Sequence, residues 1–150
     1  MKDNGVKILV NNVYKVERAV SGQELLKAVM AGGQVLEAYA KINANQVFSG
    51  KALNHLAGSI QTVKDSVTAT GAFVNVGPTV VYGRIHELGG IIKPVFKKFL
   101  HFFIDDKEIF TKIVRMPARP YLRPAFDEHQ KDIEDAVGFQ VKKLIEGATK

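Results

Sequence analysis

The 150-residue sequence contains no cysteine and no tryptophan, and its apolar runs are short. Without cysteine there are no disulfide bonds, thiolate metal ligands or cysteine nucleophiles, so any site must use other side chains. Uninterrupted apolar stretches such as residues 102–104 are only a few residues long, whereas roughly 20 are needed to cross a bilayer. Residues 1–5 are not followed by an apolar run of signal-peptide length. We therefore expect no membrane segment and no secretion by that route.

The composition is that of an ordinary globular protein. Hydrophobic residues make up 46% of the chain and charged residues 24%, and the length suits one domain. We predict a single domain over residues 1–150, with residues 1–20 flexible or peripheral. The net charge of +6 is uneven, because residues 91–124 hold eight basic side chains against three acidic ones. A basic surface is therefore expected in that part of the chain.

A long helix is predicted near the N-terminus. Ser21 followed by Glu24 is a capping-box pattern, and the apolar stripe after it predicts a helix over residues 21–43. Gly32 and Gly33 lie in its middle, where each glycine costs about 1 kcal/mol relative to alanine. The glycines indicate either a kink or close approach of another backbone within one helix, or a break into two helices.

The rest of the chain reads as hairpins followed by a final helix. Alternating valines around Gly71 predict a hairpin over residues 59–76, and a second is predicted over residues 98–114. A short helix over residues 80–88 separates them, and the last helix is expected to begin at an Asp127 cap. These elements predict an α+β fold, in which an antiparallel sheet from the two hairpins packs against a long N-terminal helix and a C-terminal helix.

Residues 116–124 contain prolines 117, 120 and 124. Each proline fixes its own φ and pushes the residue before it toward extended backbone, so we predict a stiff extended segment, the proline strap. With strand-like alternation, Arg115, Arg119, Tyr121 and Arg123 would share one side of it. Arginine and tyrosine are enriched at interface hot spots, and a stiff backbone loses little entropy on docking. We favour an interface over a plain connector between the last strand and the last helix.

No set of side chains suited to catalysis emerges. His86-Glu87 begins like the zinc-protease helix, but Gly90 stands where the second histidine is required. His129 and Asp132 could offer two metal ligands, although an exposed helical turn is the commoner reading of such a pair. Glycine-rich phosphate loops and the nucleophile elbow are absent from the sequence. We predict no enzymatic activity, no cofactor and no metal site.

The basic stretch also carries aromatic rings, among them Phe96, Phe99, Phe102 and Phe103. Lysines beside rings would suit single-stranded nucleic acid, which needs phosphate neutralisation and base stacking. The strand pattern instead favours these rings as core residues. A basic nucleic-acid-binding module, using Lys93, Lys97, Lys98 and the arginines, is the alternative function.

Four blocks stand out: residues 76–78, residues 81–90, residues 92–94, and above all the Met-Pro-Ala-Arg-Pro-Tyr-Leu-Arg-Pro-Ala-Phe-Asp stretch at 116–127. Together they resemble the virion morphogenesis and tail-completion proteins of tailed bacteriophages. The blocks occur in the family's order, and the resemblance covers roughly residue 49 to the C-terminus. A Thr-Gly-x-Leu-x-x-Ser-Ile block frequent in the family is altered here, which leaves tail terminator, neck connector and assembly factor as alternatives.

The resemblance implies a structural protein that forms a ring, typically hexameric, which ends tail-tube growth and joins the tail to the head. The implied partners are other copies of the chain, the tail tube protein and neck or connector proteins, with DNA passing through the lumen as a further contact. The implied location is the tail or neck of the virion, after assembly in the cytoplasm of a bacterial host. The predicted interface residues are Tyr82, Arg84, His86 and Glu87 in the short helix, and Arg115, Arg119, Tyr121 and Arg123 in or beside the strap.

Overall fold

The computed structural model describes residues 20–48, 54–104 and 106–148. Nearly all of the N-terminal segment predicted to be flexible or peripheral, residues 1–19, lies outside the described residues. The elements in chain order are α2 (Gly22–Val47), α3 (Asn54–Ser59), β1 (Ile60–Val67), β2 (Ala72–Pro78), α4 (Gly83–Leu88), β3 (Gly90–Ile92), β4 (Leu100–Ile104), β5 (Lys107–Thr111), β6 (Val114–Met116), α5 (Leu122–Glu128) and α6 (Gln130–Ala148).

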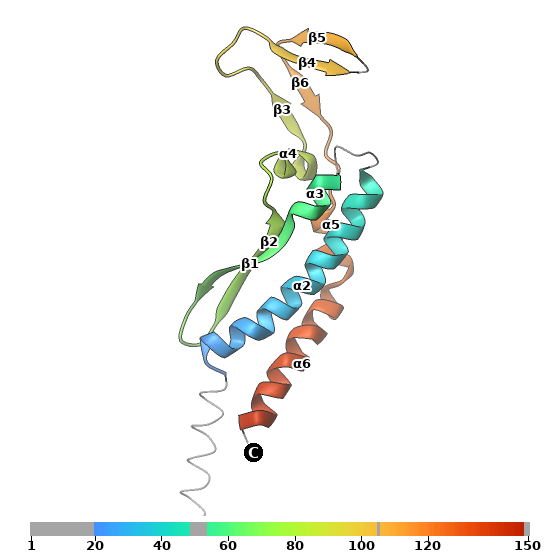
Figure 1. The fold of residues 1–150 in the computed structure, drawn as a ribbon. Coiled ribbons are helices and arrows are strands. Elements are labelled where there is room, and N and C mark those ends of the chain that lie inside the picture. Colours follow the sequence, from blue (N-terminus) through green and yellow to red (C-terminus); the bar gives the residue numbers. More distant parts are fainter. Residues whose placement is uncertain (1–19, 49–53, 105, 149–150) are drawn as a thin grey trace, which may run out of the picture.

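The molecule divides into a body and an arm (Figure 1). In the body, α2 is central: it runs beside α6 on one side and contacts the β1–β2 hairpin on the other. The arm comprises residues 90–116, with strands β3 to β6, and extends away from the end of the body where α4 lies. No helix in the described part of the chain is both long and apolar enough to cross a membrane.

The α+β prediction is confirmed, and both predicted hairpins form. β1 pairs antiparallel with β2, and β4 pairs antiparallel with β5. The hairpins do not join into one sheet, because the described strands form three separate two-stranded sheets, the third made by β3 and β6. Among the described elements, only the β1–β2 hairpin packs substantially against a long helix. None of the described helices therefore covers the arm hairpin.

The buried core lies toward the α4 end of the body, where α2, α3, α5 and the start of β1 meet. Small side chains on α2 and α5 allow close helix packing, and larger side chains from the neighbouring elements fill the space between them. The buried members are Ala40, Ala44, Phe48, Leu56, Ala57, Ile60, Tyr121 and Ala125.

The two mid-helix glycines explain how α2 packs on two sides at once. A Cβ on Gly32 would lie 2.5 Å from Val137 Cγ2 on α6, and a Cβ on Gly33 would lie 2.4 Å from Thr62 Cγ2 on β1. Both distances are too short for real contacts, so the missing side chains let both neighbours approach. The expectation of a close approach is confirmed, and a break into two helices is wrong, since α2 is continuous to Val47.

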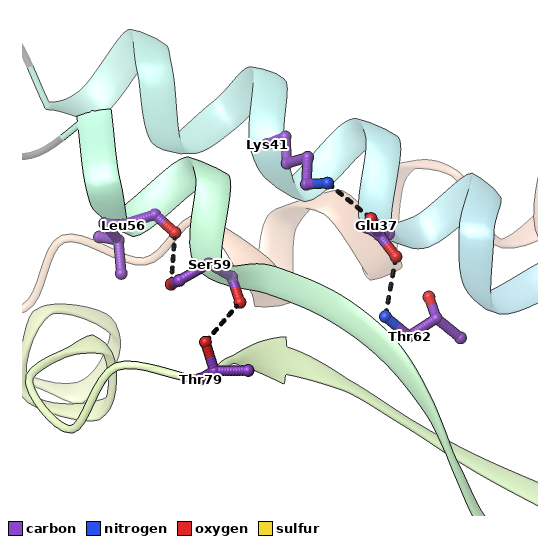
Figure 2. Close-up of polar contacts among 6 residues, drawn as sticks. All are labelled: Glu37, Lys41, Leu56, Ser59, Thr62 and Thr79. Atoms are coloured by element: carbon purple, nitrogen blue, oxygen red, sulfur yellow. Dashed lines mark hydrogen bonds and ion pairs between the residues drawn. The ribbon is translucent and has the colours of Figure 1, made fainter.

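Polar contacts tie α2 to β1 (Figure 2). One carboxylate oxygen of Glu37 lies 2.6 Å from Lys41 Nζ, and the other accepts a 2.8 Å hydrogen bond from the backbone N–H of Thr62. The Lys41 ammonium, with help from Thr62, lowers the pKa of Glu37 although partial burial opposes the shift. The edge strand of the hairpin is thereby fixed to the central helix.

A second set of contacts in Figure 2 joins α3 to the end of β2. The Ser59 hydroxyl donates to the Leu56 carbonyl at 2.7 Å. Thr79 donates twice to the Ser59 carbonyl, from its hydroxyl at 3.2 Å and from its backbone N–H at 2.9 Å. These bonds satisfy carbonyls at the end of α3, which would otherwise lack partners.

Candidate interface at the strap and the arm

One carboxylate on α4 holds the start of α5. Glu87 accepts hydrogen bonds from the backbone N–H groups of Tyr121 at 2.8 Å, Leu122 at 3.0 Å and Arg123 at 2.9 Å. The next residue, Pro124, has no N–H to satisfy. The first turn of α5 is therefore capped by a side chain 34 to 36 residues away in sequence rather than by its own N-cap residue.

This cap changes where the last helices begin. The prediction that the strap extends through Pro124 and that a helix starts at an Asp127 cap is wrong, because α5 begins at Leu122. Proline is tolerated in the first helical turn, where no intrahelical bond needs its N–H. The helix α5 ends at its C-cap, His129, and α6 starts at the next residue, Gln130.

Tyr121 belongs to the core rather than to an outward-facing edge. It is 0% exposed, and its hydroxyl donates to the Gly83 carbonyl at 3.3 Å. Burial raises the pKa of Tyr121 to about 12, with a further contribution from the negative charge of Glu87. The prediction that Tyr121 points outward beside the arginines is wrong, because the helical turn that begins at Leu122 ends the strand-like alternation.

Further contacts lock the strap to α4. The backbone N–H of Arg119 donates to the His86 carbonyl at 2.8 Å. Gly89 ends α4 with φ 68°, and a Cβ there would lie 2.7 Å from Ala118 N. His86 packs edge-on against the ring of Phe48, with centroids 4.9 Å apart. Burial lowers the pKa of His86, and the positive charge of Arg119 adds to the shift.

The structure thus brings the eight predicted interface residues to one region but gives them different environments. Glu87 and Tyr121 bond within the chain, and Tyr82 and His86 are half-buried against the core. The guanidinium-bearing residues are exposed. Arg123, with 84% of its side chain exposed, lies 3.6 Å from Asp127. Among the described residues no ion pair joins the other exposed arginines to a carboxylate; they are Arg84, Arg115 and Arg119.

An open hollow lies beside this junction, on the outer side of α4. Its volume is about 360 Å³. Val81, Leu88 and Ile91 line it and are exposed, and Arg84 lies on its wall. The exposed arginines are therefore next to uncovered apolar surface, a mixture typical of protein interfaces.

None of the described arm residues is buried. Phe96 is 99% exposed, Phe103 64% and Phe110 61%. The prediction that the rings of this stretch belong to the core is wrong. The apolar runs formed strands as predicted, but a two-stranded sheet without a covering helix leaves both faces open.

One face of the β4–β5 hairpin is aromatic. His101 stacks on Phe110 with ring centroids 4.6 Å apart and touches Phe103 edge-on at 5.2 Å. Its Nε2 lies 2.7 Å from Glu108 on the paired strand. His101 is exposed as expected for the polar side of a strand, but it shares that side with two phenylalanines.

Comparison with models of protein families, with curated proteins and with solved structures gives no match. The function of the protein is therefore inferred from the contacts of these residues and from the sequence blocks that contain them.

His129 and Asp132, considered above as two metal ligands, make structural contacts. His129 stacks on Tyr39 with centroids 3.4 Å apart, and its Nδ1 lies 3.4 Å from Asp132. The Tyr39 hydroxyl donates to the same carboxylate at 2.8 Å. These contacts join α2 to the start of α6. Within residues 20–48, 54–104 and 106–148, no group of three or more histidine, aspartate or glutamate side chains is placed to hold a metal ion.

The sequence patterns did not reveal Glu87 as a helix cap. Its partners lie more than 30 residues away, so no local spacing rule could connect them. Gly89 carried a detectable signal as a predicted helix terminus, but its contact with the strap required the fold.

Proposed function

We propose that this protein is a structural component of a phage or prophage tail or neck, which forms a ring that ends the tail tube and joins it to the head. One observation carries the proposal. The two sequence blocks that most resemble tail-completion proteins, residues 81–90 and 116–127, are hydrogen-bonded to each other and present arginines to solvent.

The chemistry of the junction suits repeated subunit contacts. Three hydrogen bonds to Glu87 and the buried Tyr121 hold the backbone that carries Arg119 and Arg123. Side chains on a fixed backbone lose less entropy when they bind. Arginine can pair with carboxylates in bidentate geometry, which favours it at interfaces. A ring needs two different complementary surfaces on each subunit, and the junction offers one of them.

The proposal is tested by adding the purified protein to tail tubes of the phage that encodes it and measuring tube length by electron microscopy. We expect the wild-type protein to cap tubes and stop their growth. A triple variant, Arg84→Ala, Arg119→Ala and Arg123→Ala, should cap at least tenfold less well at equal concentration. Replacing the same residues by lysine tests charge alone and should restore only part of the activity.

The control for this experiment is Lys64→Ala, an exposed charge on β1 far from the junction in sequence. It should cap tubes as the wild type does. If the wild-type protein neither caps tubes nor joins heads to tails, the proposed function is wrong. If the triple variant caps normally, the junction is not the contact surface.

The alternative is a nucleic-acid-binding module, which the exposed arm rings beside Lys97 and Lys98 favour. Filter binding of single-stranded DNA at two salt concentrations tests it. A nucleic-acid surface should lose affinity steeply, with a logarithmic slope of about one per phosphate contact. Weak binding that is insensitive to salt would rule out this alternative.

A further inference from the structure

The arm is an uncovered apolar surface at one end of the molecule. Burying a phenylalanine side chain removes about 200 Å² from water. At their exposed fractions, Phe96, Phe103 and Phe110 would therefore contribute roughly 450 Å². This is about half of the roughly 800 Å² that each partner gives to a standard interface. These three rings alone can therefore supply about half of one side of a stable contact.

The arm is also basic. Residues 90–116 contain six lysines or arginines and three acidic residues. Two arms in contact would bring like charges together, which costs free energy. Exposed aliphatic side chains such as Val95, which is 83% exposed, have no flat surface for stacking bases. The exposed rings suit base stacking but the aliphatic side chains among them do not, so an acidic protein surface with its own apolar centre matches the whole arm better than a second arm or a nucleic acid.

The first half of α6 carries such a surface. Residues 130–135 contain three acidic side chains and one lysine; Asp132 bonds Tyr39 of α2, which leaves the exposed Glu134 and Asp135 for a partner. Glu134 and Asp135 precede Gly138 and Phe139 by four residues each, so these residues share one side of the helix. Phe139 is 57% exposed, although Lys143 Nζ lies over its ring at 4.4 Å. This outer face of α6 points away from α2, which contacts α6 through Ile133 and Val137 at Gly32.

Within one molecule the two surfaces are apart. In the described part of the chain, the arm strands make no substantial contact with α6, and α6 runs away from the arm (Figure 1). We infer that the arm of one copy docks on the outer face of α6 of a second copy, with arm lysines against Glu134 and Asp135 and arm rings over Phe139. Because the two surfaces differ, the contact repeats head to tail. The inference rests on the proposed ring-forming function and identifies its subunit contact.

The absence of cysteine makes cross-linking a clean test, since only introduced thiols react. Val95→Cys in the arm is mixed with Gly138→Cys beside Phe139, under mild oxidation. Gly58→Cys on α3 is the matched reference, because a Cβ meets nothing within 4 Å at either glycine. All three changes leave the charges intact. We expect at least fivefold more covalent dimer for the 95–138 pair than for the 95–58 pair. A chain with both Val95→Cys and Gly138→Cys should form a ladder of oligomers.

Charge reversal sharpens the test. Lys97→Glu with Lys98→Glu, added to the Val95→Cys chain, should lower the 95–138 yield at least tenfold. Adding Glu134→Lys and Asp135→Lys to the Gly138→Cys chain should restore most of it. All four positions are exposed, and circular dichroism checks that each variant is folded. If a reversal variant does not fold, the dimer yield of the 95–138 pair relative to the 95–58 pair still tests the proposed contact.

Equal yields for the two glycine positions, or dimers linked only through position 95, would overturn the inference. Protection of the position 95 thiol by DNA, without 95–138 dimers, would also overturn it and favour the nucleic-acid reading. If tubes are capped but the 95–138 pair forms no specific dimer, this inference alone fails. A specific 95–138 ladder with uncapped tubes would instead leave the contact standing and reject the tail function.

Discussion

The body and the arm contain similar apolar residues, but the body buries them and the arm leaves them exposed. In the body, apolar side chains converge on α2, and residues such as Leu56 and Ile60 are fully buried. In the arm, phenylalanines and isoleucines occupy both strands of the β4–β5 hairpin, yet none of the described side chains is buried. A two-stranded hairpin is only marginally stable by itself in water. The body therefore supplies most of the stability of the fold, and the described part of the arm leaves apolar surface exposed.

Between the two regions lies the junction of α4 with the strap. The strands at the base of the arm, β3 and β6, begin and end beside Gly89 and Ala118. The cap that Glu87 gives to α5 fixes the same segment to the body. We expect the described part of the arm to be fixed at its base and to make no contacts with the body along the rest of its length. Changes in the arm and changes in the body should therefore have separate effects on stability.

The largest difference should come from equivalent truncations in the two regions. Leu56→Ala empties a fully buried site and should lower the free energy of unfolding by about 2 to 5 kcal/mol. Phe103→Ala, at a position 64% exposed, should lower it by less than about 1 kcal/mol. Urea denaturation measures both. Equal losses would show that the arm is part of the same cooperative core.

The next effect tests the junction. Glu87→Ala leaves three backbone donors at the start of α5 without their acceptor, and each unsatisfied buried donor costs about 1 to 3 kcal/mol. Because water can reach part of the site, we expect a loss of about 2 to 3 kcal/mol.

Glu87→Gln is the matched control, since it keeps the shape and one good acceptor and should cost about half as much. A neutral result for Glu87→Ala would mean that the observed cap contributes no stability. Thermal unfolding followed by circular dichroism provides the measurement.

Some features of the body, the junction and the arm were predictable from the sequence, and others depend on contacts between distant residues. The helix start at Ser21, the hairpins and the α4 terminus at Gly89 were predictable from neighbouring residues. The capping box itself is not formed, because Ser21 makes no side-chain cap hydrogen bond and Glu24 pairs with Lys27. The position of Tyr121 was not predictable, since a carboxylate from α4 starts a helix inside a segment whose prolines predict extended backbone. The two β runs of the arm and the turn residues between them predicted a hairpin correctly, but they could not say whether anything covers its faces.

A third prediction separates the buried tyrosine from the exposed surface by pH. Tyr121 ionises near pH 12 in the folded protein, against about 10 when unfolded. Tyr121 therefore loses its proton at a lower pH in the unfolded chain than in the folded protein. Its contribution to the free energy of unfolding is fully present below pH 10 and falls as the pH rises from 10 to 12. The loss should approach about 2 to 3 kcal/mol at the upper end.

The comparison chain is Tyr121→Phe, which lacks the hydroxyl bond to Gly83 at every pH but has nothing to ionise at this position. At neutral pH the wild type should have the larger free energy of unfolding. This difference from the variant should shrink and then reverse between pH 10 and 12. Parallel curves would contradict the prediction. Absorbance near 295 nm follows the four tyrosines without interference, since the chain has no tryptophan.

The smallest effect lies at the tip of the arm. Asp106 sits in the β4–β5 turn with φ 62°, a left-handed conformation that glycine adopts without strain. Asp106→Gly should stabilise the hairpin by less than about 1 kcal/mol and raise amide hydrogen-exchange protection in β4 and β5 a few-fold. Asp106→Ala should lower that protection, because alanine pays the left-handed penalty without the local hydrogen bonding that aspartate can offer. The midpoint of global unfolding should be the same for both variants, since none of the described long helices packs on this hairpin. If the midpoint moves together with the exchange rates, the arm and the body unfold as one unit, and the division between a stabilising body and an independently unfolding arm is wrong.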